Sequence, residues 1–211
     1  MLGFKLSKLY GILDTASLYG VTPIEVIDAF IEAGVTIVQI RHKGDSKSFY
    51  QIVETALKAA EDSITKITIN DRPDIALITQ AAGVHLGQDD LPPSVARKIL
   101  GDDAVIGIST HTIEQLRTAA KEPVDYISFG PIFESFTKKG GNKPLGLEML
   151  TLAKQLCLSK PIVAIGGITL KNISQAISAG ADSAAIISDI YNAEDPVARI
   201  KLLNRPQNTP R

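Results

Sequence analysis

The sequence has almost no cysteine, and this excludes a fold that depends on internal disulfide bonds. Cys157 is the single cysteine among 211 residues, so it has no partner within the chain. It lies in a helix-like segment, and we expect it to be a buried packing residue. A chain that folds without disulfides is typical of a reducing compartment, and we therefore predict a cytoplasmic protein.

The sequence also lacks long apolar runs and an excess of charge of either sign. No stretch of about 18 uninterrupted apolar residues occurs, and residues 1–9 have no apolar segment typical of a secretory signal. The 22 basic and 23 acidic residues give a net charge of −1. We therefore expect no membrane and no nucleic acid as a partner, and any site for an anion must be a local cluster of basic residues.

What the sequence does contain is a regular alternation of short apolar, β-branched segments with amphipathic segments, which is typical of βα units with buried strands. The predicted strands span residues 9–13, 37–40, 66–69, 83–86, 105–108, 126–129, 162–165 and 183–187. The predicted helices span residues 23–33, 46–63, 73–79, 93–100, 112–120, 147–156, 170–179 and 196–203. Eight consecutive units favour a closed (β/α)8 TIM barrel over an open sheet.

The barrel is predicted to be a single α/β domain over residues 1–203. Residues 204–211 are polar and contain proline, and we expect them to form a flexible C-terminal tail. One connection is unusually long: residues 131–146, after the sixth strand, are polar and rich in glycine and lysine. Loops of this length in a compact domain are often functional, and we expect this loop to close over a binding site.

Acidic and basic residues follow several of the predicted strands, at the rim where such barrels place their active sites. Asp71 and Asp90 follow the third and fourth strands, where two neighbouring carboxylates suit Mg²⁺. Arg41 and Lys43 follow the second strand and Lys138 follows the sixth, which suits a diphosphate. Each residue alone is equally well explained by ordinary loop salt bridges, but their occurrence after consecutive strands favours a metal–diphosphate site.

A glycine pair and a serine follow the last two strands, where barrels commonly bind phosphate. Gly166 and Gly167 follow the seventh strand and Ser188 follows the eighth. A glycine pair is also typical of a simple tight turn, yet the position in the barrel favours phosphate binding.

The three histidines have different expected roles. His85 lies within a predicted strand, so we expect a buried, hydrogen-bonded residue of the core. His42 lies between two cationic residues and is expected to be exposed to solvent. His111 either transfers protons, because imidazole titrates near neutral pH, or merely precedes a helix; both interpretations stay open.

These segments, taken together, resemble the thiamine phosphate synthase family, which also includes thiazole tautomerases. The matching segments are VQIRHKG at 38–44, IND at 69–71, GVHLGQDD at 83–90, GISTHT at 107–112, GPIF at 130–133, TK at 137–138, PLGL at 144–147 and AIGGI at 164–168. Any one of them is weak evidence, but the ordered series over almost the whole chain is specific.

The resemblance implies a Mg²⁺-dependent transferase that condenses hydroxymethylpyrimidine diphosphate with a thiazole phosphate and releases diphosphate. It implies that the pyrimidine diphosphate contacts Gln39, Arg41, Lys43, Asn70, Ser109 and Lys138, and that Mg²⁺ binds Asp71 and Asp90. It implies that the thiazole phosphate contacts Ser135, Thr137, Gly167, Ile187 and Ser188. Arg41, Lys43, Ser109 and Lys138 would be the catalytic residues of this set.

The chain departs from the family pattern in the long loop. Where the family usually has P-T-x-T-K, this chain has Glu134, Ser135, Phe136, Thr137 and Lys138. Serine keeps the hydroxyl of threonine, whereas an acid beside a phosphate site is electrostatically unfavourable. The effect of Glu134 and Ser135 on activity stays open.

Two other functions compete with the synthase. A thiazole tautomerase shares the barrel and a Ser-x-His segment but needs no metal–diphosphate site, and a non-catalytic barrel that binds a phosphate ligand needs no complete set of acids and cations. Asn70, Asp71 and Asp90 argue for the synthase. The form of the thiazole and the oligomeric state, including a homo-oligomer, stay open.

Overall fold

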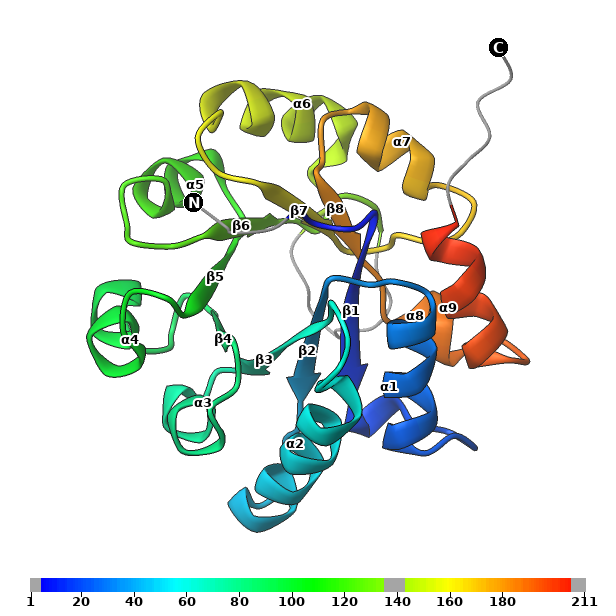
Figure 1. Cartoon of the computed structure of the whole chain (residues 1–211). Helices are drawn as coiled ribbons and strands as arrows, with labels where there is room; N and C mark the ends of the chain where they lie inside the picture. The colour runs from blue at the N-terminus through cyan, green and yellow to red at the C-terminus, as the bar shows by residue number, and fades with distance from the viewer. Residues whose placement is uncertain (1–4, 135–142, 206–211) are drawn as a thin grey trace.

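The computed structural model describes residues 5–134 and 143–205, and its strands form a closed parallel barrel (Figure 1). The strands are β1 (Leu9–Asp14), β2 (Ile37–Arg41), β3 (Lys66–Asn70), β4 (Gly83–Leu86), β5 (Val105–Thr110), β6 (Tyr126–Phe129), β7 (Ile162–Ile165) and β8 (Ser183–Ala185). They pair in the order of the sequence, and β8 pairs with β1 through Leu9–Ala184 and Tyr10–Ala185. The predicted (β/α)8 barrel is therefore confirmed.

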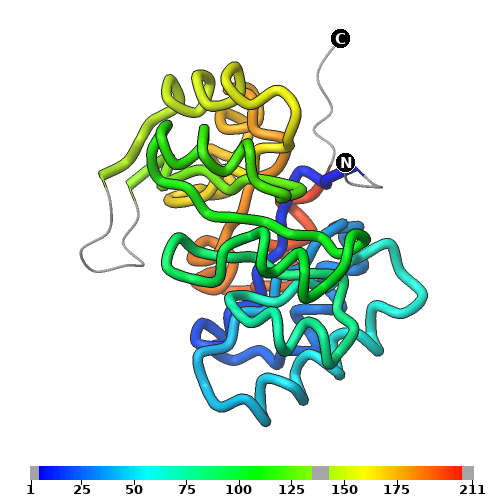
Figure 2. The backbone as a smooth tube through the Cα atoms, turned by 90° about the vertical axis from the view of Figure 1, so that its left-hand side faces the viewer, coloured from blue at the N-terminus to red at the C-terminus, as the bar shows by residue number. Residues whose placement is uncertain are grey.

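The helices form a layer around the outside of the barrel (Figures 1 and 2). They are α1 (Pro23–Glu32), α2 (Ser46–Ala60), α3 (Pro73–Thr79), α4 (Pro93–Leu100), α5 (Ile113–Ala119), α6 (Gly146–Leu156), α7 (Ile173–Ser178), α8 (Ser188–Tyr191) and α9 (Pro196–Asn204), with a short 3-10 helix η1 (Thr15–Ser17) after β1. Polar caps begin several of them: Thr22 and Glu25 form a capping box at α1, and the Thr112 hydroxyl accepts from Gln115 at α5. No helix in the described part of the chain is long and apolar enough to cross a membrane.

Several boundaries differ from the sequence prediction, and the differences matter for the site. Strands β1, β2, β3 and β5 extend one or two residues beyond their predicted ends, so Arg41, Asn70 and Ser109 lie within strands and not after them. The predicted eighth strand was too long: β8 ends at Ala185, and the unpredicted helix α8 begins at Ser188. A helix of one turn has too few residues to produce a recognisable apolar period.

The C-terminal helix closes the barrel against its first strand. Asn204, placed in the tail by the sequence prediction, is the last residue of α9. Its Oδ1 accepts from the Leu9 N–H at 3.0 Å, and its Nδ2 donates to the Ala33 carbonyl at 2.7 Å. In Figure 2 the start of β1 and the end of α9 lie side by side.

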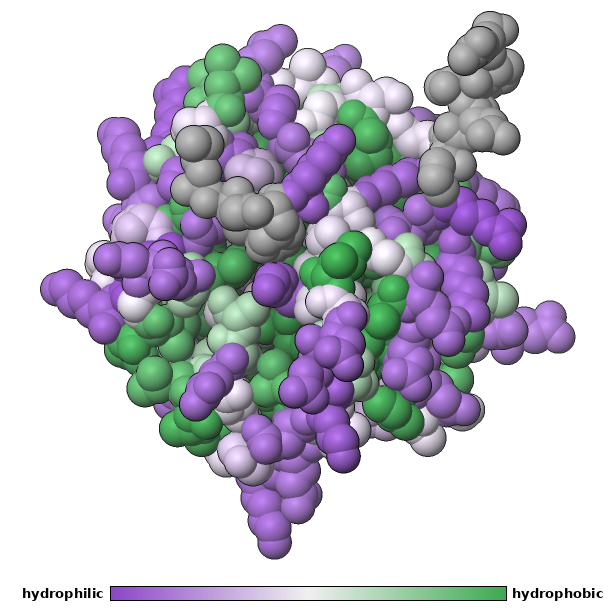
Figure 3. Space-filling model, in the orientation of Figure 1, coloured by the Kyte–Doolittle hydropathy of each residue, from purple (hydrophilic) through white to green (hydrophobic). Residues whose placement is uncertain are grey.

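Apolar side chains fill two separate regions. The larger region lies between the strands and the helices and includes Cys157, which is buried as predicted. The smaller one lies inside the barrel and is built from alternate residues of the strands, among them Tyr10, Ile12, Tyr126 and Val163. Outside, exposed apolar side chains gather over α3 and α4, where Leu77 and Ile78 contribute most (Figure 3).

At the base of the barrel, where the strands begin, one arginine donates hydrogen bonds to several loops. Arg97 of α4 donates to the carbonyls of Gly101, Asp102, Ala104 and Pro123 and pairs with Asp125 at 2.7 Å. The same Asp125 oxygen accepts from the Ile106 N–H. This cluster joins the start of β5 to the start of β6, at the opposite end of the strands from the predicted site.

Candidate active site

Asp71 and Asp90 lie against each other at the carboxyl ends of β3 and β4, as predicted. Their carboxyl groups are hydrogen-bonded to each other. Asp71 has a left-handed backbone (φ 62°), and its N–H donates to the His85 carbonyl of the neighbouring strand at 2.9 Å. The Gly87 N–H donates to Asp90 Oδ2 at 2.6 Å. The two acids are thus aimed at each other by backbone contacts on both loops.

The two carboxyl groups have opposite pKa shifts. Burial and the neighbouring Asp71 raise the pKa of Asp90, against the effect of the Gly87 N–H. Burial would also raise the pKa of Asp71, but the hydrogen bonds with Lys43 and Asp90 outweigh it and hold that pKa below its usual value. Of the two acids, Asp71 therefore loses its proton at the lower pH and Asp90 at the higher.

Each predicted cation on β2 or just after it is paired with an acid. Lys43 Nζ lies 2.8 Å from Asp71 Oδ2, and Arg41 lies 2.7 Å from Asp14 Oδ2. Asp14, the last residue of β1, is well buried, and Arg41 is partly exposed. The structure therefore brings Arg41, Lys43, Asp71 and Asp90 together on adjacent strand ends, β1 to β4.

Asp14 was missed by the sequence analysis. It follows the first strand just as the other site residues follow theirs, so its position was a sufficient signal. Its Oδ1 accepts from the Ala16 N–H at 3.2 Å, which caps η1. With both oxygens engaged, Asp14 holds the Arg41 guanidinium at the rim.

The other residues predicted to contact a pyrimidine diphosphate lie at different depths. Asn70 ends β3 beside Asp71 and hydrogen-bonds to it. Ser109 is half-buried in β5, and its Oγ lies 2.9 Å from His85 Nε2. Gln39 is only 3% exposed, and its Nε2 donates to the Tyr10 hydroxyl inside the barrel. Gln39 therefore lies below the rim, beneath the other members of the set.

Two of the three histidines are held in place by the loops. The prediction that His42 is exposed to solvent was wrong: its ring nitrogens bond to Thr15 Oγ1 at 2.8 Å and Ser48 Oγ at 2.9 Å, and the ring packs against Phe49. His111 Nδ1 lies 2.7 Å from the Gly130 carbonyl, which accepts only, so the hydrogen is on Nδ1. Within the described part of the chain, His111 forms no hydrogen bond with another predicted site residue.

The glycine pair after β7 packs tightly against the segment that follows β6. Gly166 and Gly167 both have positive φ, and an added Cβ would overlap Pro131 at the first position and the Glu134 carbonyl at the second. Glycine is needed at both positions for packing as well as for conformation. Ile187 and Ser188 lie next to each other at the start of α8. The predicted contacts at Ser135, Thr137 and Lys138 lie outside the described residues.

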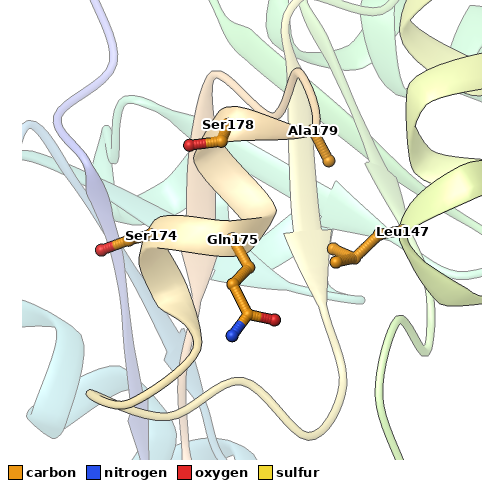
Figure 4. Close-up of a pocket in the computed structure, with 5 residues that line it drawn as sticks. All are labelled: Leu147, Ser174, Gln175, Ser178 and Ala179. Atoms are coloured by element: carbon orange, nitrogen blue, oxygen red, sulfur yellow. The ribbon is translucent and has the colours of Figure 1, made fainter.

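A shallow surface pocket of about 460 Å³ lies away from these residues, between α6 and α7 (Figure 4). It is lined by Leu147 of α6 and by Ser174, Gln175, Ser178 and Ala179 at α7. None of the predicted site residues that the structure describes lines it.

The residues present fit a magnesium ion that is completed by its substrate. Within residues 5–134 and 143–205, no group of three or more His, Cys, Asp or Glu side chains is suited to holding a metal. The Asp71–Asp90 pair instead offers two neighbouring carboxyl groups, with Lys43 beside Asp71. Mg²⁺ is commonly bound by one or two carboxylates together with substrate phosphates and water.

Comparisons with known proteins point to one family. The family model described as thiamine monophosphate synthase matches residues 9–190. The chain is 40% identical over 205 residues to a thiamine-phosphate synthase of Caldicellulosiruptor saccharolyticus, covering 95% of this chain and 90% of the relative. It is 42% identical over 200 residues to that of Pelotomaculum thermopropionicum, covering 93% and 90%. The structure matches a thiamine phosphate pyrophosphorylase from Pyrococcus furiosus with a TM-score of 0.82 and 31% identity, covering 93% of each chain.

Proposed function

The chain belongs to the thiamine monophosphate synthase family, and from this premise we propose how its rim carries out the reaction. The protein is a transferase that forms thiamine phosphate. In our proposal the strand ends of β1 to β5 bind the pyrimidine diphosphate through Mg²⁺, and the segments after β7 and β8 bind the thiazole phosphate.

The proposed reaction breaks one bond and forms one. The bond between the pyrimidine methylene carbon and the diphosphate oxygen breaks, and its electron pair leaves with the diphosphate. The thiazole nitrogen then donates its lone pair to the methylene carbon, which gives a thiazolium product. No nucleophile from the protein is required, so the protein acts by stabilising charge and by holding the two substrates in position.

The observation that carries the proposal is the acid pair with a lysine beside it. Asp71 and Asp90 hydrogen-bond to each other, and Lys43 lies 2.8 Å from Asp71. Two acids would repel a bare diphosphate, so they suit this substrate only if a cation lies between. Asp71 and Asp90 would hold Mg²⁺. When bound, Mg²⁺ supplies positive charge that stabilises the leaving diphosphate.

The basic residues would bind the diphosphate directly. Arg41 is anchored by Asp14 through one of its terminal nitrogens, which leaves further N–H groups of the planar guanidinium to donate to phosphoryl oxygens. Lys43 is more than half exposed and is the more mobile donor. We propose that Lys43 exchanges its contact with Asp71 for one with the substrate when Mg²⁺ binds.

The test is turnover by the purified protein with both substrates over a range of Mg²⁺ concentrations, with thiamine phosphate and diphosphate measured by mass spectrometry. We expect both products in equal amounts, and none with excess chelator. Full turnover in chelator would contradict the metal assignment. Isomerisation of the thiazole without condensation would identify a tautomerase instead.

A further inference from the structure

The inside of the barrel holds three ring side chains that the proposed reaction leaves without a role. Tyr10 of β1, His85 of β4 and Tyr126 of β6 are all buried. The ring centroids of Tyr10 and Tyr126 are 5.5 Å apart, and so are those of His85 and Tyr126, whose planes are nearly parallel at 24°. Gly107 of β5 makes room for them, because a Cβ there would overlap the Tyr126 ring.

These rings form a continuous chain of hydrogen bonds that ends at a predicted substrate contact. It runs from Gln39 Nε2 to Tyr10 Oη (2.9 Å), on to Tyr126 Oη (2.6 Å), on to His85 Nδ1 (2.8 Å), and from His85 Nε2 to Ser109 Oγ (2.9 Å). Gln39, Tyr10 and Tyr126 are at most 3% exposed. The chain is therefore shielded from solvent until it reaches Ser109.

The members of this chain are uncharged at neutral pH. Both ring nitrogens of His85 contact hydroxyl groups inside the barrel, those of Tyr126 and Ser109, and a neutral imidazole with one hydrogen satisfies both contacts. Burial raises the pKa of Tyr10 and of Tyr126, so both keep their phenolic hydrogens. Each ring thus has a single hydrogen to donate.

One direction of these hydrogen bonds satisfies every link. The amide nitrogen of Gln39 donates to one lone pair of the Tyr10 oxygen, and in this direction the Tyr10 hydrogen goes to Tyr126, its partner at 2.6 Å. The Tyr126 hydrogen then goes to His85 Nδ1, which must accept. The one ring hydrogen of His85 is consequently on Nε2 and is donated to Ser109. The Ser109 oxygen accepts from within the barrel, so its own hydrogen is not used by the chain.

We propose that His85 and Tyr126 are positioning residues that hold the Ser109 hydroxyl as a hydrogen-bond donor toward an acceptor atom of the pyrimidine diphosphate. The inference rests on the proposed function in one respect, the contact of Ser109 with that substrate. Neither His85 nor Tyr126 touches the substrate in this proposal; they act through Ser109. A preoriented donor is effective because it does not have to reorganise as charge develops.

The first test determines the direction of the hydrogen bonds and does not require an activity assay. Long-range ¹H–¹⁵N spectra of protein labelled at histidine nitrogen distinguish the two neutral tautomers, and His85→Gln assigns the signal among only three histidines. We expect His85 with hydrogen on Nε2 and a lone pair on Nδ1. A hydrogen on Nδ1 would overturn the inference, because Ser109 would then have to donate into the barrel.

The second test asks whether Tyr126 acts through Ser109. Ser109→Ala is expected to lower kcat about 100-fold, the usual effect of losing one preoriented donor. Tyr126→Phe keeps Ser109 but removes the hydrogen bond that fixes His85, so the Ser109 hydroxyl is less well oriented. This variant should lower kcat roughly tenfold and leave KM for the pyrimidine diphosphate within about twofold. The double variant should be no slower than Ser109→Ala alone. A double variant that loses the product of both factors would overturn the inference.

Two further variants serve as the control for Tyr126→Phe and as its replacement if it does not fold. Tyr191→Phe removes another buried hydroxyl, one that donates to the Ile12 carbonyl outside the chain, and should leave kcat unchanged. If Tyr126→Phe does not fold, Tyr10→Phe breaks the chain one link earlier and should still lower kcat, by less. Unchanged kcat in the folded variant would overturn the inference. A wild-type protein with no turnover would overturn the proposed function instead, while the His85 tautomer would still report the direction of the chain.

Discussion

The acid pair at the ends of β3 and β4 makes a prediction about individual residues. Asp71→Asn and Asp90→Asn should each lower kcat/KM at least about 100-fold and raise the Mg²⁺ concentration needed for half-maximal rate, since each removes a metal-binding charge. Asp89→Asn changes the exposed acid next to Asp90 and is the control, with an effect below about twofold. Initial rates over a Mg²⁺ titration measure this. Equal losses in all three variants would show that the pair has no special role.

The same pair predicts how Mg²⁺ affinity changes with pH. Because the pKa of Asp90 is raised, the pair still holds a proton at pH values where an ordinary aspartate has lost it. Mg²⁺ must displace that proton, so its half-saturating concentration should rise as the pH is lowered. Calorimetric titrations with Mg²⁺ in the presence of diphosphate at several pH values would measure this. An affinity independent of pH would contradict the raised pKa of Asp90.

The buried His85 predicts a window in which stability depends on pH. Its pKa is lowered to about 4 in the folded protein, chiefly by burial, from 6.5 when unfolded. Between these values the unfolded chain binds more protons, so the free energy of unfolding rises with pH across the window, by on the order of 3 kcal/mol in total. Urea unfolding at pH 4.5 to 7.5 should show a smaller rise in His85→Gln. His111→Asn, at the half-exposed histidine, is the control and should keep the wild-type rise.

At the residue scale, the sequence predicted the acidic and basic residues of the rim better than the residues that hold them in position. Asp71 and Asp90 were recognisable because polar residues after apolar strands have few structural reasons to recur. Asp14 was recognisable by the same position and was overlooked, whereas Tyr126 was not recognisable, because a tyrosine within an apolar strand is ordinary. The link from His85 to Ser109 depends on the register of the neighbouring strands β4 and β5, and no spacing along the sequence shows which side chains of two paired strands meet.

At the scale of elements, the Arg97 cluster predicts a large effect on stability from one helix. Arg97→Ala leaves several carbonyls and the Asp125 carboxylate without their partner, and Arg97 is only 16% exposed in its side chain. We expect a loss of about 3 kcal/mol in the free energy of unfolding, with kcat/KM unchanged because the cluster lies at the base. Arg72→Ala breaks an exposed pair with Asp74 and should cost less than about 1 kcal/mol. Urea denaturation of both variants measures the difference, and equal losses would contradict it.

The elements themselves were predictable in type and order, since buried parallel strands and amphipathic helices have different apolar periods. Their ends were less predictable. Strand β5 continues to Thr110 through polar residues, because Ser109 and Thr110 still pair with β6 although they no longer look like a strand. Helix α8 was missed for the opposite reason, since four residues carry no period.

At the scale of the whole molecule, barrel closure depends on a contact between the two ends of the chain. Asn204→Ala leaves the N–H of the fully buried Leu9 and the Ala33 carbonyl without partners. We expect a loss of about 2 kcal/mol in the free energy of unfolding. Asn192→Ala, at an exposed asparagine after α8, is the control and should change it by less than about 0.5 kcal/mol. Thermal and urea unfolding measure both, and a stable Asn204→Ala would show that α9 does not support closure.

The closed order of the strands also constrains when the protein can form during its synthesis. The partners of Leu9 in the finished barrel are Ala184 of β8 and Asn204 of α9, which are synthesised long after β1. Until then the open edge of β1 is exposed, together with the apolar residues that will line the interior. The nascent chain therefore emerges as an unclosed array of βα units, and its apolar strand edge stays exposed until α9 has been synthesised.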